Sequence, residues 1–319
     1  MILRRRRGCL AVALFLCLTS HAMNAAAEFS EDLDKQWNFG KPAESEARFR
    51  SELAKYPPDS REALEIATQI ARTHSLRREF AHADAMLDGI APKLAAVPAR
   101  VQVRAELERG RTRNSGGDKA AAIVLFRRAL VTSAKDALPG ADYYKVDALH
   151  MLGIASPPAE QLDWNLQALA AAEASPVKRT REWAAALHNN IGWTYFEQGD
   201  ARTALVHWQK ALPVREAMGR PGAVRVAKWT IARGYRATGQ LDDAQKLQEA
   251  LVVETEKIGE PDGYVYEELA EIALARADPP AAAAWAGKAH ALLKDDGHLK
   301  ANEAARLDRL AAIAQGKAP

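Results

Sequence analysis

Small and apolar residues recur with a helical period along most of the chain. Ala204, Trp208 and Ala211 stand at i, i+4 and i+7 after a glycine at position 199. The same pattern returns 40 residues later, after Gly239. Residues at this spacing fall on one face of a helix, and glycine favours the turn between two helices. The pattern therefore predicts helix–turn–helix units.

Prolines mark the boundaries between these units. Six of them are spaced 37 to 45 residues apart, at Pro58, Pro98, Pro139, Pro176, Pro221 and Pro261. Proline fits a loop or the first turn of a helix and disfavours helix just before it. A period near 40 residues predicts an internal repeat, with units at about 63–97, 102–138, 143–175, 181–218, 222–259 and 262–293.

Each unit has a small residue at an equivalent place in its first helix. These residues are Ala71, Gly110, Gly153, Gly192, Ala232 and Ala270. Bulky residues such as Phe126 and Trp208 stand at an equivalent place in the second helix. With the turn glycines, this pattern resembles the tetratricopeptide repeat, in a variant longer than that family's usual repeat. Unit three departs most, with a Ser-Pro-Pro turn at 156–158 and with Gln161 and Asn165 where alanine and an aromatic residue are expected.

The resemblance implies an all-α fold, a right-handed superhelical solenoid of paired helices. Neighbouring hairpins must stack to bury their apolar faces, and solenoid ends need polar capping helices. Residues 28–62 are expected to form the N-terminal capping region, with an amphipathic helix after the turn at 37–40. Residues 294–319 are expected to form a closing helix and a tail.

Residues 1–27 have the three parts of a secretory signal peptide. Four arginines at 4–7 precede an apolar run, and three alanines end at Ala27. The apolar run is too short to span a bilayer, which needs about 20 residues. We therefore expect cleavage after Ala27, export to the periplasm or beyond, and no membrane span afterwards. Whether the segment is cleaved or retained is not decided by the sequence.

Removal of this segment changes the charge and the cysteine content. It carries four arginines and no acidic residue, so the formal charge falls from +3 to −1. Both cysteines, Cys9 and Cys17, leave with it. The remaining chain offers no basic excess for a nucleic-acid partner, no disulfide and no cysteine ligand.

Motifs that carry catalysis are missing from the sequence. It has no Gly-x-Ser-x-Gly elbow, no His-Glu-x-x-His pair and no phosphate-binding loop. The glycines of Ser115–Lys119 fit a turn that Asp118 caps. His74 and His82 are eight residues apart across a turn, and the other histidines are scattered. We therefore expect no enzyme activity, no cofactor and no metal.

The resemblance implies a ligand surface, because first helices line the concave groove in that family. Residues at the corresponding positions are Arg72, Arg104, Arg111, His150, Asn189, Asn190, Trp193, Trp229, Arg233, Arg236, Glu267 and Glu271. Asparagine can bridge to a peptide backbone, arginine can bind a carboxylate with two parallel hydrogen bonds, and tryptophan and arginine are frequent interface hot spots. The competing interpretation is that the tryptophans pack between repeats and the arginines are solvated.

The sequence thus favours a non-catalytic scaffold that binds a protein or peptide. An acidic segment is expected near Arg233 and Arg236, because the sixth unit is acidic and the fifth basic. One alternative is a sensor for a small molecule or cell-wall fragment, with Trp193 and Trp229 in one cavity. The other is an enzyme with an unfamiliar site. The oligomeric state and the identity of the partner are not decided by the sequence.

Overall fold

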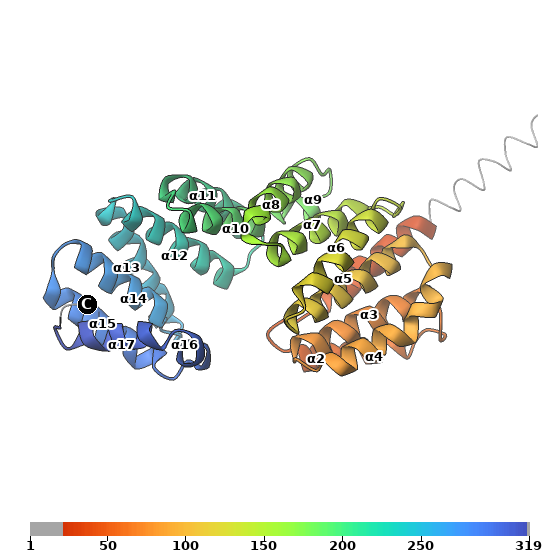
Figure 1. The fold of residues 1–319 in the computed structure, drawn as a ribbon, viewed down its shortest axis with the longest axis horizontal. Coiled ribbons are helices and arrows are strands. Elements are labelled where there is room, and N and C mark those ends of the chain that lie inside the picture. The colour runs from red at the N-terminus through yellow and green to blue at the C-terminus, as the bar shows by residue number, and fades with distance from the viewer. Residues whose placement is uncertain (1–21, 318–319) are drawn as a thin grey trace, which may run out of the picture. The chain divides into compact units, whose positions relative to one another are not determined.

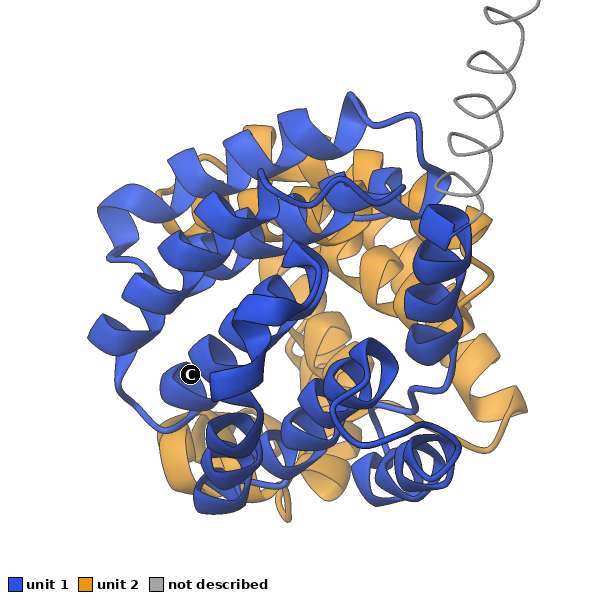
Figure 2. Ribbon diagram, turned by 90° about the vertical axis from the view of Figure 1, so that its right-hand side faces the viewer, with its two compact units in different colours: residues 1–183 blue, residues 184–319 orange. Residues whose placement is uncertain are grey.

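The computed structural model describes residues 22–317, and this part of the chain is all-α, without a β-strand. Consecutive helices form antiparallel hairpins (Figure 1). This arrangement confirms the predicted class, a solenoid of helical hairpins. The chain divides after Trp183 into two compact units, which Figure 2 colours separately.

Unit 1 ends at Trp183 and begins, within the described residues, with a helix at 22–35. Its further helices are α2 (Pro42–Leu53), α3 (Arg61–Leu76), α4 (Phe80–Ile90), the 3₁₀ helix η1 (Ala91–Ala96), α5 (Ala99–Ser115), α6 (Lys119–Ser133), α7 (Ala141–Ala155), α8 (Pro158–Glu173) and α9 (Lys178–Arg181). The Ser-Pro-Pro segment forms the short turn between α7 and α8.

Unit 2 begins at Ala184. Its helices are α10 (Ala184–Glu197), α11 (Ala201–Ala217), α12 (Pro221–Ala237), α13 (Leu241–Lys257), α14 (Gly263–Ala275), α15 (Pro279–Leu293), α16 (Gly297–Asn302) and α17 (Ala304–Ala314). The last helix, α17, packs on α15 and covers the apolar face that the last hairpin would otherwise expose.

The turns inside five of the hairpins share one backbone geometry, and the Ser-Pro-Pro turn between α7 and α8 differs. Gly117, Gly199 and Gly239 have positive φ angles, and Arg78 and Ala277 take the same conformation in their hairpins. In each turn the next amide N–H donates to the carbonyl five residues earlier, at 2.8–3.0 Å. This closure is the left-handed C-cap that glycine favours. Gly117, Gly199 and Gly239 therefore lie in turns, as their spacing in the sequence predicts.

Small first-helix residues lie against bulky second-helix side chains. A Cβ atom added at Gly110 would lie 2.4 Å from the Phe126 ring, and one added at Gly192 would lie 2.3 Å from Nε1 of Trp208. Both rings are fully buried. Close helix contact at these crossings requires that one helix has no side chain there, which explains the alternation of small and large residues.

The predicted signal peptide lies largely outside the described residues, which begin at 22. Its predicted cleavage point after Ala27 falls inside the helix at 22–35. Ala26 and Ala27 are buried, and Nη1 of Arg61 donates to the Ala26 carbonyl at 3.1 Å. Among the described helices, none has the length and apolar content needed to cross a membrane. Export and cleavage remain predictions.

Candidate interaction surfaces

The predicted ligand residues all lie on the first helices of hairpins. We call the exposed side of α3, α5 and α7 the first-helix surface of unit 1, and that of α10, α12 and α14 the first-helix surface of unit 2. The two surfaces differ in how their arginines pair with acids of the chain itself, so each is described by itself.

In unit 1 the helix at 22–35 contributes an acid to this surface. Asp34 Oδ1 accepts from Nη2 of Arg104 at 2.7 Å, although the two residues are 70 positions apart. Arg179 pairs with the same carboxylate. Arg104 also donates to the Tyr144 hydroxyl at 2.5 Å, and its side chain is 3% exposed. Arg104, predicted to face a groove, thus has its guanidinium buried against Asp34 of the helix at 22–35.

The other predicted arginines of unit 1 share carboxylates within the chain. Glu108 accepts from Arg72 at 3.2 Å and from Arg111 at 2.7 Å. Arg111 also donates to Asp147 at 2.5 Å. The guanidinium of Arg72 lies 5.1 Å from the centroid of the Phe39 ring, which provides a cation–π contact. Each predicted arginine of unit 1 thus pairs with at least one carboxylate of the chain itself.

His150 lies beside the end of unit 1. Its ring is 5.0 Å from that of Trp183, and burial lowers the pKa of this histidine to about 4. A neutral imidazole that packs at a tilt against an indole contributes packing rather than a positive charge for a partner.

In unit 2 three aromatic rings surround one arginine. The guanidinium carbon of Arg233 lies 5.7 Å from the Trp193 ring, 5.5 Å from Phe196 and 5.6 Å from Trp229. The two tryptophan rings are themselves 6.3 Å apart. The guanidinium thus lies beside both tryptophans, and the structure brings together the aromatic and basic residues predicted from α10 and α12.

The hydrogen-bonding capacity of Arg233 is not used up within the described residues. Its Nη1 is 3.9 Å from Glu268 Oε2, too far for a hydrogen bond, and its Nε has no partner. Burial lowers the pKa of this guanidinium. Its side chain nevertheless remains 29% exposed. The exposed part of this side chain lies beside aromatic faces and can donate to an incoming acceptor, and a carboxylate matches a guanidinium best.

Arg236 has a different environment on the same helix. Its Nε and Nη2 donate to the two oxygens of Glu268 at 2.5 and 3.2 Å. Glu268 is buried, so this pair fixes α12 against α14. Two arginines therefore share one carboxylate, which leaves this part of the surface with an excess positive charge.

The predicted acids of α14 are also paired. Glu267 accepts from Arg306 at 2.6 and 2.5 Å, and Glu271 accepts from Arg309. Both arginines belong to α17. The predicted acids of α14 are therefore paired with arginines of the closing helix, and Arg306 also pairs with Glu303.

The two predicted asparagines lie about one turn before Trp193 on α10. Both are half-buried, and Nδ2 of Asn189 lies 3.4 Å from Oδ1 of Asn190. The Asn189 carbonyl accepts from Nε1 of Trp208 at 3.3 Å. Val226 lies on α12, three and seven residues before Trp229 and Arg233, and is 51% exposed. These residues extend the first-helix surface of unit 2 beyond the aromatic cluster.

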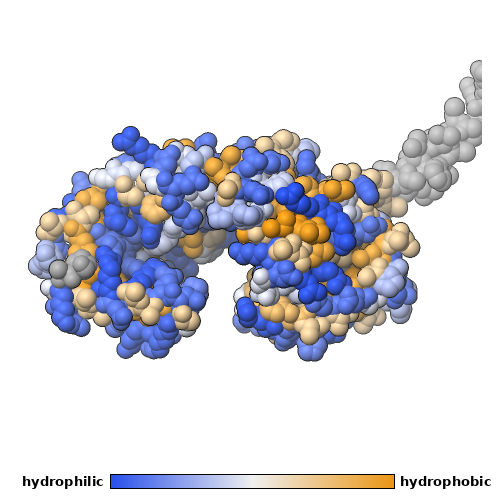
Figure 3. Space-filling view, viewed as in Figure 1, coloured by the Kyte–Doolittle hydropathy of each residue, from blue (hydrophilic) through white to orange (hydrophobic). Residues whose placement is uncertain are grey.

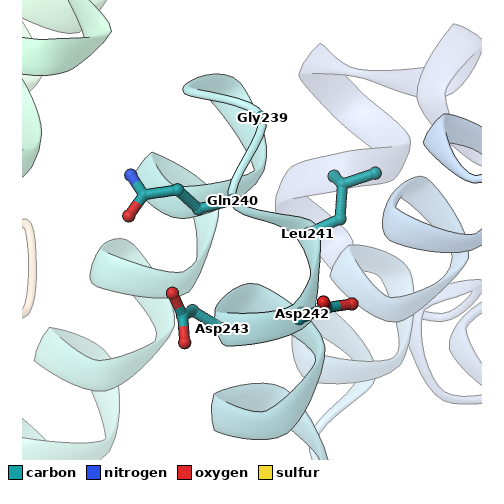
Figure 4. A pocket seen from close by; sticks show the side chains of 5 residues that line it. All are labelled: Gly239, Gln240, Leu241, Asp242 and Asp243. Atoms are coloured by element: carbon teal, nitrogen blue, oxygen red, sulfur yellow. The ribbon is translucent and has the colours of Figure 1, made fainter.

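A hollow lies at the turn between α12 and α13. It is lined by Gly239, Gln240, Leu241, Asp242 and Asp243 (Figure 4). Asp242 is paired with Arg276, and the hollow contains none of the predicted site residues. The face drawn in Figure 3 is mainly hydrophilic, with hydrophobic side chains in separate groups.

Sequence analysis missed Asp34 and Glu268, the acids that decide which arginines are free. Neither carries a motif, and each is one carboxylate among 41 acidic residues. Their partners are 70 and 32 positions away, so the pairings follow only from the stacking of helices.

Comparison with known proteins supports the repeat. Residues 184–218, which hold α10 and α11, match the family model of the tetratricopeptide repeat. A search of curated protein sequences found no match. Among solved structures, the apo form of RapI has a TM-score of 0.67 at 10% identity, over 92% of this chain and 81% of that chain.

Two further structures have the same kind of fold. Aspartyl phosphate phosphatase F from Bacillus subtilis has a TM-score of 0.56 at 14% identity, over 93% of this chain and 78% of that chain. The Cut9–Hcn1 hetero-tetramer of APC/C has a TM-score of 0.60 at 12% identity, over 94% of this chain and 55% of that chain. At these identities the similarity concerns the fold alone. The chain is thus similar in fold to tetratricopeptide-like helical solenoids.

Proposed function

We propose that this protein is an exported, non-catalytic scaffold whose first-helix surface in unit 2 binds an acidic segment of another protein. The observation that carries the proposal is Arg233, held between three aromatic rings with hydrogen-bonding capacity left over. Export is supported by the signal-peptide pattern of residues 1–27, and the scaffold role by the similarity to helical-repeat proteins.

The choice of an acidic partner follows from the local charge. Glu268 accepts two hydrogen bonds from Arg236. Its distance to Arg233 is 3.9 Å, so it forms no hydrogen bond with that guanidinium. A partner carboxylate would accept from the guanidinium while the apolar part of its segment packs on Trp193, Trp229 and Val226. Charge-assisted bonds of this kind are stronger than neutral ones.

A small-molecule sensor is less well supported. That alternative requires a cavity that Trp193 and Trp229 share. The side chain of Arg233 lies beside both tryptophans instead, with its guanidinium within 6 Å of each ring centroid. The described hollow at Gly239–Asp243 lies at a turn and contains no aromatic residue.

The proposal is tested with a fluorescent peptide that contains glutamate and leucine, and with its glutamine counterpart. Binding to residues 28–319 is measured by fluorescence anisotropy at two salt concentrations. The Arg233→Gln variant is suitable because Glu268 keeps Arg236 as its partner. Arg202→Gln is the matched control, since Arg202 is an exposed arginine of unit 2 on the second helix α11.

We expect tighter binding of the glutamate peptide, with an affinity that falls as salt increases. Arg233→Gln should weaken this binding about tenfold, as the loss of about 1.4 kcal/mol implies, while Arg202→Gln leaves it unchanged. Equal binding of both peptides, or equal effects of the two variants, would remove the claim.

A further inference from the structure

The turn between α3 and α4 in unit 1 brings two histidines and a glutamate together. His74 lies in the last turn of α3, Glu79 is the N-cap of α4, and His82 lies in its first turn. Arg78 closes the turn with a φ of 63°, and the Glu79 amide donates to the His74 carbonyl at 2.9 Å. The backbone thus places residues eight positions apart on one side of the turn.

The side chains of the three residues converge. One ligand atom from each, an imidazole nitrogen or a carboxylate oxygen, lies within 4.8 Å of the other two. Nδ1 of His74 is 2.6 Å from Oε2 of Glu79, and the two imidazole rings are 5.5 Å apart. Glu46 of α2 lies behind them, with Oε1 at 3.6 Å from Nε2 of His74. His82 is exposed, so the cluster is open to solvent.

We propose that His74, Glu79 and His82 form a binding site for a divalent transition-metal ion such as Zn²⁺. Imidazole nitrogen and carboxylate oxygen are ligands that Zn²⁺ prefers, at about 2.0–2.2 Å. Tetrahedral ligands at that distance are about 3.4 Å from one another, so movements of about 1 Å bring the three atoms into place. This site is independent of the surface in unit 2 and of the function proposed for it.

Arg77 supplies a competing positive charge at the same place. Its Nη2 lies 2.9 Å from Oε2 of Glu79, 3.0 Å from Nδ1 of His74 and 2.5 Å from Oε2 of Glu46. A bound cation would repel this guanidinium and take its place at Glu79. Arg77 retains Glu46 as its partner in that state. The arginine is therefore expected to weaken metal binding, and its removal to strengthen it.

His74 and His82 are eight residues apart across a turn, and from the sequence we expect no metal. Eight residues of continuous helix would place the two histidines about 12 Å apart along the axis. The reversal of the chain at Arg78 removes that separation.

The test is isothermal titration of the purified chain with Zn²⁺ alone, repeated with Co²⁺, whose visible spectrum reports ligation. The variants are His82→Ala, Arg77→Ala and, as a control, His298→Ala, since His298 lies exposed in unit 2. His82 is exposed, so its variant is expected to fold, and circular dichroism checks all three.

We expect one Zn²⁺ ion to bind at this site in the unaltered chain and in His298→Ala. His82→Ala should weaken this binding at least about tenfold, and Arg77→Ala should tighten it. A chain that does not bind Zn²⁺, or a His82→Ala variant that binds as tightly as the unaltered chain, overturns the site. An Arg77→Ala variant with equal or weaker affinity overturns the competing role of the arginine.

Discussion

Replacement of Gly192 by alanine should destabilise unit 2, because the new Cβ meets a ring that has no free space. The added atom would lie 2.3 Å from Nε1 and 2.5 Å from Cδ1 of Trp208. Ordinary contacts begin at about 3.4 Å, so the ring must retreat by about 1 Å. Trp208 is fully buried and packed between Trp193 and Phe196, with ring centroids at 5.1 and 5.5 Å.

The expected change in the free energy of unfolding of Gly192→Ala combines two opposing effects. Overpacking of a buried site costs about 1–3 kcal/mol, whereas alanine in place of a helical glycine contributes about 0.5–1 kcal/mol of stability. Gly287 of α15 offers a control, since its nearest neighbour, the Ala314 Cβ, would lie at 4.0 Å. The difference between the two glycine-to-alanine variants isolates the packing cost, which we expect to be about 1–3 kcal/mol.

The assay is urea unfolding of the full chain, followed by far-ultraviolet circular dichroism. Gly287→Ala should unfold at the same or a higher urea concentration than the unaltered chain, and Gly192→Ala at a lower one. A Trp208→Leu substitution should cost less in the Gly192→Ala background, because it relieves the clash. Equal midpoints for the two glycine variants would refute the close packing of α10 on α11.

Three further predictions follow from other parts of the chain. Burial lowers the pKa of His188 to about 4, so below pH 6.5 the unfolded chain binds a proton that the folded chain excludes. The free energy of unfolding should therefore fall between pH 6.5 and 4 by about 1–3 kcal/mol, and His188→Gln should reduce this slope in urea titrations. Asp34→Asn should destabilise unit 1 by about 2–3 kcal/mol, because it removes the nearer of the two carboxylates that pair with the buried Arg104, whereas Asp32→Asn at an exposed site should change thermal unfolding little; equal effects would argue against the buried pair. Mass spectrometry of the protein from a cell-envelope fraction should find a chain that begins just after Ala27, and a chain that still carries the four arginines would contradict cleavage.

The repeat architecture could be predicted because its signals are local. Glycines at 117, 199 and 239 occupy turn positions with positive φ. Prolines stand at the start of helices, as Pro221 does in α12. The small residue Gly192 lies against Trp208, as the alternation indicated. Each of these features follows from a short stretch of chain or from one hairpin.

The ion pairs that the predicted ligand residues form within the chain could not be predicted, because they join residues far apart in the sequence. The predicted arginines look alike in sequence, yet Arg104 is buried against Asp34, whereas Arg233 is 29% exposed and lies 3.9 Å from its nearest carboxylate. The pair of Arg179 with Asp34 joins residues 145 positions apart. Which arginine meets which acid in unit 1 depends on how the helix at 22–35 packs against α3, α5 and α9, and no short-range pattern encodes that.

The central claim is that another polypeptide lies on the first-helix surface of unit 2. The most direct test expresses the protein in a cell that exports it, with a photo-cross-linking amino acid in place of the residue at position 226 or 206. Both positions hold exposed valines, 51% and 48% accessible, but Val226 is on the first helix α12 and Val206 on the second helix α11. We predict polypeptide adducts from position 226 that Arg233→Gln diminishes, and few from position 206. Equal adducts from both positions, or adducts from position 206 alone, would contradict the account.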